Sequence, residues 1–155
     1  MAKNKKSNTV AINTFKNKVF ITKTPQETRN LARNFASVLK GGDIVFLNGN
    51  LGSGKTTFTQ GITKFFGNKG FARSSSFMLV NEYQAFNNLK LFHLDLYRLK
   101  SSTIFDIGIE DYLYSGNISL IEWPQRLIDG QNESHWNVEI ESLVNKRKIK
   151  IEKKK

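Results

Sequence analysis

The chain has 155 residues, of which 39% are hydrophobic, so it is long enough for one domain with its own core and too short for two. It contains no cysteine, which excludes disulfides, thiolate metal sites and thiol catalysis. The formal net charge is +11, but residues 1–7 contribute +3 and residues 146–155 contribute +6, which leaves residues 8–145 at only +2. The body of the chain is therefore nearly neutral, unlike a typical nucleic-acid-binding domain.

The basic ends set the expected domain boundaries. We expect residues 1–8 to form a disordered basic tail, residues 9–152 to form a single domain and residues 153–155 to form a second basic tail. Terminal lysine clusters are usually solvated, and contact with RNA or an acidic partner is the alternative. Val10 to Ile21 alternates loosely between apolar and polar residues, which predicts an entry strand.

A helix is predicted to begin after Thr24. Thr24 can cap the first turn, Pro25 suits the first helical position, and the side chain of Glu27 can reach back toward the cap. Gly41 and Gly42 supply a flexible stop. One apolar stripe at helical spacing predicts an amphipathic helix that packs on the core: Leu31, Phe35, Val38 and Leu39.

The next segment reads as strand, glycine-rich loop and helix. Ile44 to Leu47 is a short continuous apolar run, typical of a strand that is buried on both faces of a parallel sheet. Gly49 to Thr57 follows at once, and a helical stretch then continues through Phe66 and ends at Gly67. This order of elements is the one that a phosphate-binding loop, or P-loop, requires.

The loop matches the P-loop pattern of glycine, four free positions, glycine, lysine and a hydroxyl residue. In such a loop the glycines let backbone amides turn toward the phosphates, and the helix N-terminus adds its positive dipole. Lys55 is expected to neutralise the β and γ oxygens of ATP, and Thr56 is expected to ligate Mg²⁺. The candidate nucleotide-binding residues of this segment are Gly49, Leu51, Gly52, Ser53, Gly54, Lys55, Thr56 and Thr57.

The middle of the chain predicts a hairpin followed by helix. Phe77 to Tyr83 and Leu89 to Leu96 are rich in aromatic and aliphatic residues, and Asn87-Asn88 between them favours a tight turn. We expect these two segments to pair as an antiparallel hairpin. Ser101 to Tyr114 predicts one or two short helices broken at Gly108.

The last third of the chain predicts three strands. Ile118 to Ile121 is a buried strand, and Trp136 to Leu143 and Lys148 to Glu152 form a final strand pair around Asn145. Taken together, the elements predict an α/β fold, namely a P-loop NTPase-like three-layer sandwich with a mostly parallel central sheet and an antiparallel hairpin.

Two acidic residues follow buried strands and are candidates for the metal site. A Mg²⁺·ATP site needs a carboxylate near the metal, usually at the carboxyl end of a neighbouring strand. Asp95 ends the run of Leu91 to Leu94, and Glu122 ends the run of Ile118 to Ile121. Either carboxylate can serve, and for an isolated acid a solvated turn residue is the alternative. The candidate catalytic residues are therefore Lys55, Asp95 and Glu122.

Other conspicuous residues lie next to these acids. His93 shares a strand face with Asp95, so it can point at the site, steer the carboxylate or be a structural histidine. Arg98 can hold an acidic neighbour, stabilise charge at the γ-phosphate or form a surface pair. Trp123 can pack under the metal site or contact a partner.

Four blocks follow one another along the chain, namely Gly49 to Thr57, Ser74 to Tyr83, His93 to Leu99 and Ile121 to Pro124. A P-loop alone specifies little, but a histidine-to-arginine block followed by glutamate-tryptophan is highly specific. In this order the blocks resemble those of the bacterial TsaE family, also called YjeE, the ATPase of the machinery that makes threonylcarbamoyladenosine in tRNA. The resemblance covers about residues 24–127.

The resemblance implies roles for the site residues. It implies that Lys55 and Thr56 bind ATP and Mg²⁺, that Glu122 is the metal-site carboxylate and that Asp95 is needed for hydrolysis. The family's contacts with the nucleotide base imply roles near Thr24 and at Arg147. Its partners imply TsaD-like and TsaB-like subunits of the threonylcarbamoyl-transfer complex.

The resemblance also implies a nucleotide-responsive mobile loop at Ser74 to Phe77. The family usually has Ser-Pro-Thr before the aromatic residue of this loop, whereas this chain has Ser75 and Ser76 in place of proline and threonine. A hydroxyl is kept, but the restraint that proline places on φ is lost.

We therefore expect an ATP hydrolase that serves a tRNA-modifying complex through its assembly or turnover, with tRNA contacted indirectly. A P-loop small-molecule kinase and a non-catalytic ATP-dependent assembly switch are the alternatives. The sequence has no apolar run near the roughly 20 residues that span a bilayer, and no secretory signal, so we expect a cytoplasmic protein without membrane contact.

Overall fold

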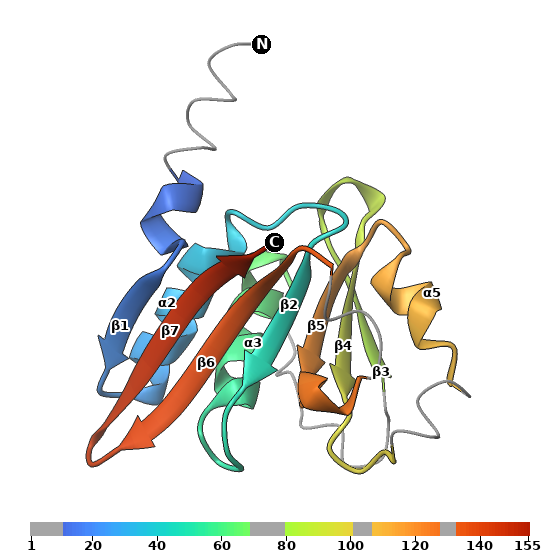
Figure 1. Cartoon of the computed structure of the whole chain (residues 1–155). Helices are drawn as coiled ribbons and strands as arrows, with labels where there is room; N and C mark the ends of the chain where they lie inside the picture. The colour runs from blue at the N-terminus through green and yellow to red at the C-terminus, as the bar shows by residue number, and fades with distance from the viewer. Residues whose placement is uncertain (1–10, 69–79, 101–106, 128–132) are drawn as a thin grey trace.

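The computed structural model describes residues 11–68, 80–100, 107–127 and 133–155. Their strands form one seven-stranded sheet in the order β1-β7-β6-β2-β5-β4-β3 (Figure 1). The strands are β1 (Lys18–Thr22), β2 (Ile44–Asn48), β3 (Val80–Gln84), β4 (Lys90–Asp95), β5 (Ile118–Glu122), β6 (His135–Leu143) and β7 (Lys146–Lys154). The labelled helices are α2 (Pro25–Ala36), α3 (Lys55–Phe65) and α5 (Ile109–Leu113), and 3₁₀ turns lie at Phe86–Asn88 and Pro124–Arg126.

The sheet is parallel in its centre and antiparallel at its edges. The four adjacent strands β6, β2, β5 and β4 run parallel to one another. β1 pairs antiparallel with β7, β7 with β6, and β4 with β3. The predicted α/β fold with a hairpin is confirmed: β3 and β4 form the expected hairpin, and β6 and β7 form the expected final pair. The parallel part is limited to the four central strands.

The alternation of apolar residues along β2 creates the three layers. Val45 and Leu47 face α2 and α3 in one core cluster, whereas Ile44 and Phe46 face the other side of the sheet. On that second side the cluster includes Ile109 and Leu113 of α5 and Leu127. A strand with both faces buried fits the continuous apolar run in the sequence.

The α2–α3 layer depends on close contact between the two helices. A Cβ atom at Gly61 in α3 would overlap the carbonyl oxygen of Arg29 and lie 2.6 Å from the Cβ of Ala32 in α2. The absence of a side chain at Gly61 therefore lets α2 pack directly against the helix that follows the P-loop. The largest fully buried side chains of this cluster include Trp136, Phe35 and Phe58.

The predicted start of α2 is confirmed, and its end comes earlier than the apolar stripe suggests. The amide of Glu27 donates to Thr24 Oγ1 at 3.1 Å, and Pro25 is the first helical residue. The Glu27 carboxylate accepts from the amide of Lys23 at 2.7 Å. α2 ends at Ala36, and the amides of Ser37, Val38 and Leu39 donate to the carbonyls three residues earlier.

The predicted entry strand from Val10 to Ile21 is wrong in its first half. Residues 11–15 are helical, and β1 begins only at Lys18. The helical turn buries Phe15 and lays Ala11 and Ile12 against the core. The apolar spacing of residues 11, 12 and 15 fits a helix face as well as a strand, so loose alternation did not decide between them.

The turns follow the predicted asparagines and glycine. Asn87 and Asn88 both have positive φ in the β3–β4 connection, and Asn145 has positive φ between β6 and β7. Gly108, at φ 65°, directly precedes α5. Residues 77–79 of the predicted hairpin and 101–106 of the predicted helical segment lie outside the described residues.

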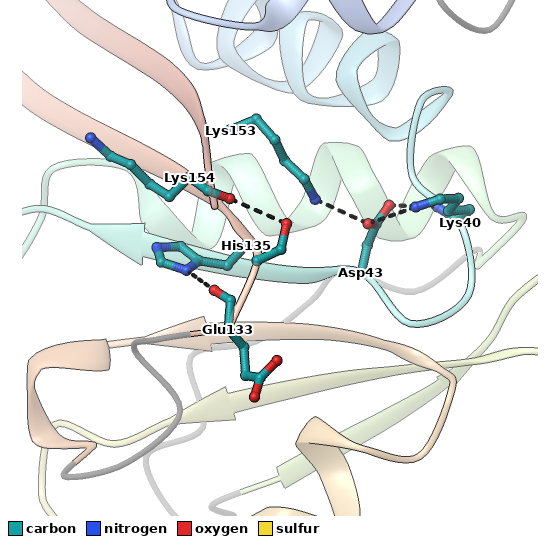
Figure 2. Close-up of polar contacts among 7 residues, drawn as sticks. Lys40, Asp43, Glu133, His135, Lys153 and Lys154 are labelled. Carbon is teal, nitrogen blue, oxygen red and sulfur yellow. Dashed lines mark hydrogen bonds and ion pairs between the residues drawn. The ribbon is translucent and has the colours of Figure 1, made fainter.

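The basic tail expected at residues 153–155 is wrong for its first two residues, because β7 continues through Lys154. Lys153 Nζ lies 3.2 Å from Asp43 Oδ1 (Figure 2). The same ammonium lies 5.0 Å from the ring centre of Trp136. Lys40 Nζ contacts the same Asp43 oxygen at 3.3 Å, so the buried carboxylate has two cations. Lys153 is therefore a paired strand residue whose ammonium contacts the buried Asp43, and it is not part of a free tail.

The expected N-terminal tail at residues 1–8 and the loop at Ser74 to Phe77 lie outside the described residues. No helix in the described parts of the chain is long and apolar enough to cross a membrane.

Candidate nucleotide-binding site

The P-loop connects the end of β2 to the start of α3 and has the backbone that its glycines permit. Gly49, Gly52 and Gly54 all have positive φ, at 153°, 74° and 115°. At Gly49 a Cβ atom would overlap Ser53 Oγ and lie 2.5 Å from the carbonyl oxygen of Ile140. The loop is thus folded tightly against β6, and only glycine fits its first position.

Lys55 is the first residue of α3, and its side chain bends back across the loop. Nζ donates to the carbonyls of Gly49 at 2.7 Å and Asn50 at 2.9 Å. The residue is only 5% exposed, and burial lowers its pKa, an effect opposed by the charges of Glu122 and Asp95. Its ammonium therefore lies at the loop, where the negative charges of Glu122 and Asp95 interact with it electrostatically.

Asp95 and Glu122 lie side by side at the edge of the sheet that carries the P-loop. They are register partners in the parallel pair of β4 and β5, and Glu122 is also the partner of Leu47 in β2. The sequence predicted that either carboxylate could emerge at this edge near the P-loop, and the register places both strand-end acids there.

Asp95 is half-buried and has a perturbed carboxyl group. Oδ1 accepts a hydrogen bond from the amide of Tyr97 at 3.0 Å. Burial raises the pKa of Asp95; the Tyr97 amide opposes this rise, the Glu122 charge adds to it, and His93 and Lys55 oppose it. A carboxyl group with a raised pKa beside a P-loop is suited to accept a proton.

Glu122 is buried and paired with a buried histidine. It is 4% exposed, and its Oε1 lies 2.9 Å from Nε2 of His93, which is fully buried. The sequence left three interpretations open for His93, and all three concerned the neighbourhood of Asp95. The structure places its ring against a carboxylate, and that carboxylate is Glu122 rather than Asp95.

Trp123 lies under the P-loop lysine. It has positive φ, at 59°, and Lys55 Nζ lies 4.9 Å from the centre of its ring. Tyr97 packs against the same indole with ring centres 4.8 Å apart. Of the two readings left open for Trp123, packing at the site is the one that the structure supports. The contact between Tyr97 and Trp123 was not predicted, because the position of Trp123 depends on the conformation of the turn after β5.

Arg147 comes from β7 but lies against the P-loop. A Cβ atom at Gly54 would be 2.9 Å from Arg147 Nε. Arg147 Nη1 donates to Thr28 Oγ1 at 3.4 Å, and Thr28 Oγ1 is 2.8 Å from Thr22 Oγ1. No sequence pattern pointed to Thr22 or Thr28, whereas the structure places them beside the predicted Arg147 because β1, β7 and α2 meet there.

The remaining predicted residues line the loop and the first turn of α3. Leu51 is 67% exposed, whereas Ser53 is buried and its Oγ has no hydrogen-bond partner in the described parts of the chain. Thr56 and Thr57 are half-buried in the first turn of α3. The residues fit a magnesium nucleotide: the loop excludes side chains where phosphates approach, and a lysine, a hydroxyl residue and two carboxylates lie around it.

A metal site made by protein residues alone is not found in the described part of the chain. No three histidine, cysteine, aspartate or glutamate side chains there are grouped to hold a metal ion. The magnesium of P-loop proteins does not need such a group, because a P-loop hydroxyl, one carboxylate and phosphate oxygens hold it.

Comparison with known proteins agrees with this geometry. The family model described as "Threonylcarbamoyl adenosine biosynthesis protein TsaE" matches residues 22–149. The chain belongs to the TsaE family. The match extends past Arg147, beyond the region that the sequence motifs cover.

Curated relatives and a solved structure extend over most of the chain. A protein of Rickettsia conorii named "tRNA threonylcarbamoyladenosine biosynthesis protein TsaE" is 40% identical over 80% of this chain and 71% of its own. A protein of the same name from Aquifex aeolicus is 36% identical over 88% of this chain and 97% of its own. The crystal structure of Bacillus subtilis YdiB matches with a TM-score of 0.70 and 28% identity, covering 88% of this chain and 84% of that one.

Proposed function

We propose that this TsaE-family protein binds Mg²⁺·ATP at its P-loop, hydrolyses the ATP slowly and thereby serves the threonylcarbamoyladenosine modification of tRNA. The observation that carries the proposal is the arrangement of Lys55 within the P-loop, beside Asp95 and Glu122 on adjacent strands. This is the set of groups that phosphoryl transfer uses: one cation, a metal carboxylate and a group that handles the attacking water.

Binding would use the loop backbone, Lys55 and Arg147. The amides at the start of α3 would donate to phosphate oxygens, and Lys55 would exchange its bonds to the Gly49 and Asn50 carbonyls for bonds to phosphate. Arg147 lies against Gly54, beside Thr28, so it would contact the nucleotide next to the phosphates.

Thr56 and Glu122 would hold the magnesium. When bound, the metal supplies positive charge to the β and γ oxygens as negative charge develops there. Asp95 would orient the attacking water and accept its proton, which its raised pKa favours. Trp123 lies beneath Lys55 and helps to exclude bulk water from the ammonium.

The family membership supports the role in tRNA modification, and we propose that partners complete it. Relatives at 36–40% identity carry the name of the threonylcarbamoyladenosine pathway. We propose TsaD-like and TsaB-like subunits as the partners, indirect contact with tRNA and a cytoplasmic location where tRNA is modified.

The test compares ATP turnover by the wild type with that by Glu122→Gln, alone and with the partner subunits. The substitution keeps the side-chain shape and removes the charge near the metal, so turnover should fall by more than about tenfold. Glu110→Gln, on the exposed face of α5, is the matched control and should keep wild-type turnover. Equal turnover in both variants would refute the role of Glu122.

Two further measurements separate the alternative functions, one of tRNA modification and one of the fate of the γ-phosphate. Full support of tRNA modification by a non-hydrolysable ATP analogue would indicate an assembly switch without catalysis. Stoichiometric transfer of phosphate to a metabolite, in place of phosphate release to water, would indicate a kinase.

A further inference from the structure

His93 is a buried polar residue to which the proposed mechanism has so far given no role. It lies in β4, two residues before Asp95, and none of its surface is exposed. Nε2 lies 2.9 Å from Glu122 Oε1, and among the described residues the buried Nδ1 has no hydrogen-bond partner. Within this part of the chain, the polar contact of the ring is therefore with the carboxylate proposed to hold the metal.

The two ring nitrogens must differ in protonation. An ionised carboxylate only accepts, so Nε2 must carry the hydrogen of the bond to Glu122. A second hydrogen on Nδ1 would be a buried donor without an acceptor, which is costly. The geometry thus selects the Nε2–H tautomer of His93.

We infer that His93 is a positioning residue whose Nε2–H holds Glu122 Oε1, so that the second oxygen of Glu122 is presented to the magnesium of the nucleotide site. This inference rests on the proposed function. Partners that orient a metal-binding carboxylate act in the same way in many metal sites, and their loss typically weakens metal binding about 10- to 100-fold.

The contact also distinguishes Glu122 from Asp95. Glu122 is held by a side chain of the neighbouring strand, whereas the contact of Asp95 is with the amide of Tyr97 in its own turn. A carboxylate fixed by a buried partner on another strand suits a metal ligand, and one tied only to its own turn suits a group that moves with the attacking water.

The tautomer can be tested directly, because the chain has only two histidines. His135 is the internal control: its Nδ1 lies 2.7 Å from the carbonyl oxygen of Glu133, so it must donate from Nδ1 (Figure 2). Long-range ¹H–¹⁵N spectra of the wild type should show opposite tautomers, Nε2–H for His93 and Nδ1–H for His135. An Nδ1–H tautomer at His93 would overturn the inference, whatever the protein's activity.

The positioning role is tested by Mn²⁺ affinity in the presence of a non-hydrolysable ATP analogue. His93→Leu keeps the volume and removes the donor, and we expect Mn²⁺ to bind about 10- to 100-fold more weakly. His93→Gln places an amide nitrogen near the former Nε2 and should restore affinity to within about threefold of the wild type. His135→Leu removes the other buried histidine by the same substitution and should leave Mn²⁺ affinity unchanged.

A double variant distinguishes positioning from a general effect of the substitution. If His93 acts only through Glu122, adding His93→Leu to Glu122→Gln should weaken Mn²⁺ binding no further. Additive losses, or equal losses in His93→Leu and His93→Gln with folding retained by melting temperature, would overturn the inference alone. Failure of the wild type to bind Mn²⁺ with nucleotide would overturn the proposed function and this inference with it.

Discussion

Among the described residues, the ammonium of Lys55 is bound by neutral groups at the P-loop rather than by an ion pair. Its ammonium has two backbone carbonyls and an aromatic face as neighbours, and the nearest carboxylates act through their field. Burial makes this position costly for a cation, and the opposing charges reduce that cost. A phosphate would provide the stronger, charge-assisted bonds that these neighbours lack.

Replacing Lys55 with alanine should weaken ATP binding roughly 10- to 100-fold, because a charge-assisted hydrogen bond is worth about 1.5–3 kcal/mol. Titration calorimetry would measure the change. Lys64→Ala, at the exposed end of the same helix, is the control and should bind ATP as the wild type does. Wild-type affinity in Lys55→Ala would contradict the P-loop assignment.

Asp95 should make the stability of the nucleotide-free protein depend on pH. Burial raises its pKa above the ordinary value of 3.8, so the folded protein binds this proton more tightly than the unfolded chain does. Stability from this group is therefore present at low pH and is lost as pH rises through the raised pKa, which leaves a penalty at neutral pH.

Asp95→Asn should accordingly raise the melting temperature at neutral pH, and the gain should shrink as pH falls toward the ordinary aspartate pKa. The amide oxygen of asparagine can still accept from the Tyr97 amide. Asp111→Asn, on the exposed side of α5, should show no such trend. A gain in Asp95→Asn that stays constant from pH 7 down to about pH 3.5 would rule out titration of Asp95 as its cause.

At the scale of elements, the unit of β2, P-loop and α3 packs closely against β6 at Gly49. Gly49→Ala should cost about 1–3 kcal/mol of stability and also weaken ATP binding, because its Cβ would strike Ser53 Oγ and the Ile140 carbonyl. Gly52→Ala is the matched variant: it also has positive φ, but no atom lies within 4 Å of its Cβ, so only about 1–2 kcal/mol of backbone strain applies. Urea unfolding and ATP titration of both variants would test this. Equal ATP affinity in the two would show that the contact with β6 does not shape the loop.

Helix caps and turns were the elements that the sequence predicted best. Thr24, Pro25 and Glu27 act through neighbours a few residues away, so local chemistry alone located the start of α2. Asn145 likewise marked the turn between the last two strands. The end of β7 could not be predicted in this way, because Lys153 is held by Asp43, a residue 110 positions away in the sequence.

At the scale of the whole molecule, the bridge from Lys153 to Asp43 connects β7 with the start of β2 (Figure 2). Lys153→Met keeps most of the side chain and removes the charge, which leaves the buried Asp43 with Lys40 alone. We expect a loss of about 1–2 kcal/mol in the free energy of unfolding, measured with urea. Lys155→Met, at an exposed position, should be close to neutral. Similar losses in both variants would show that the bridge contributes no stability.

The candidate site was predictable in its residues and not in its contacts. The spacing around Lys55 and the strand-end positions of Asp95 and Glu122 were enough to identify three charged groups of the site. Their roles could not be divided, because the hydrogen bond from His93 to Glu122 depends on the register of β4 against β5. Arg147 was expected from the family, but its position against Gly54 follows from the pairing of β7 in the sheet.

The sheet order has a consequence for how the protein is made. β2 carries the P-loop, yet one of its two neighbours is β6, which is synthesised after the other three parallel strands, β2, β4 and β5. A ribosome that has released β2, α3 and β5 holds a chain whose P-loop strand still has one unpaired edge, and Gly49 still lacks the Ile140 carbonyl beside it. Nucleotide binding should therefore begin only when β6 has emerged from the ribosome. A nascent chain halted before residue 135 should not bind ATP.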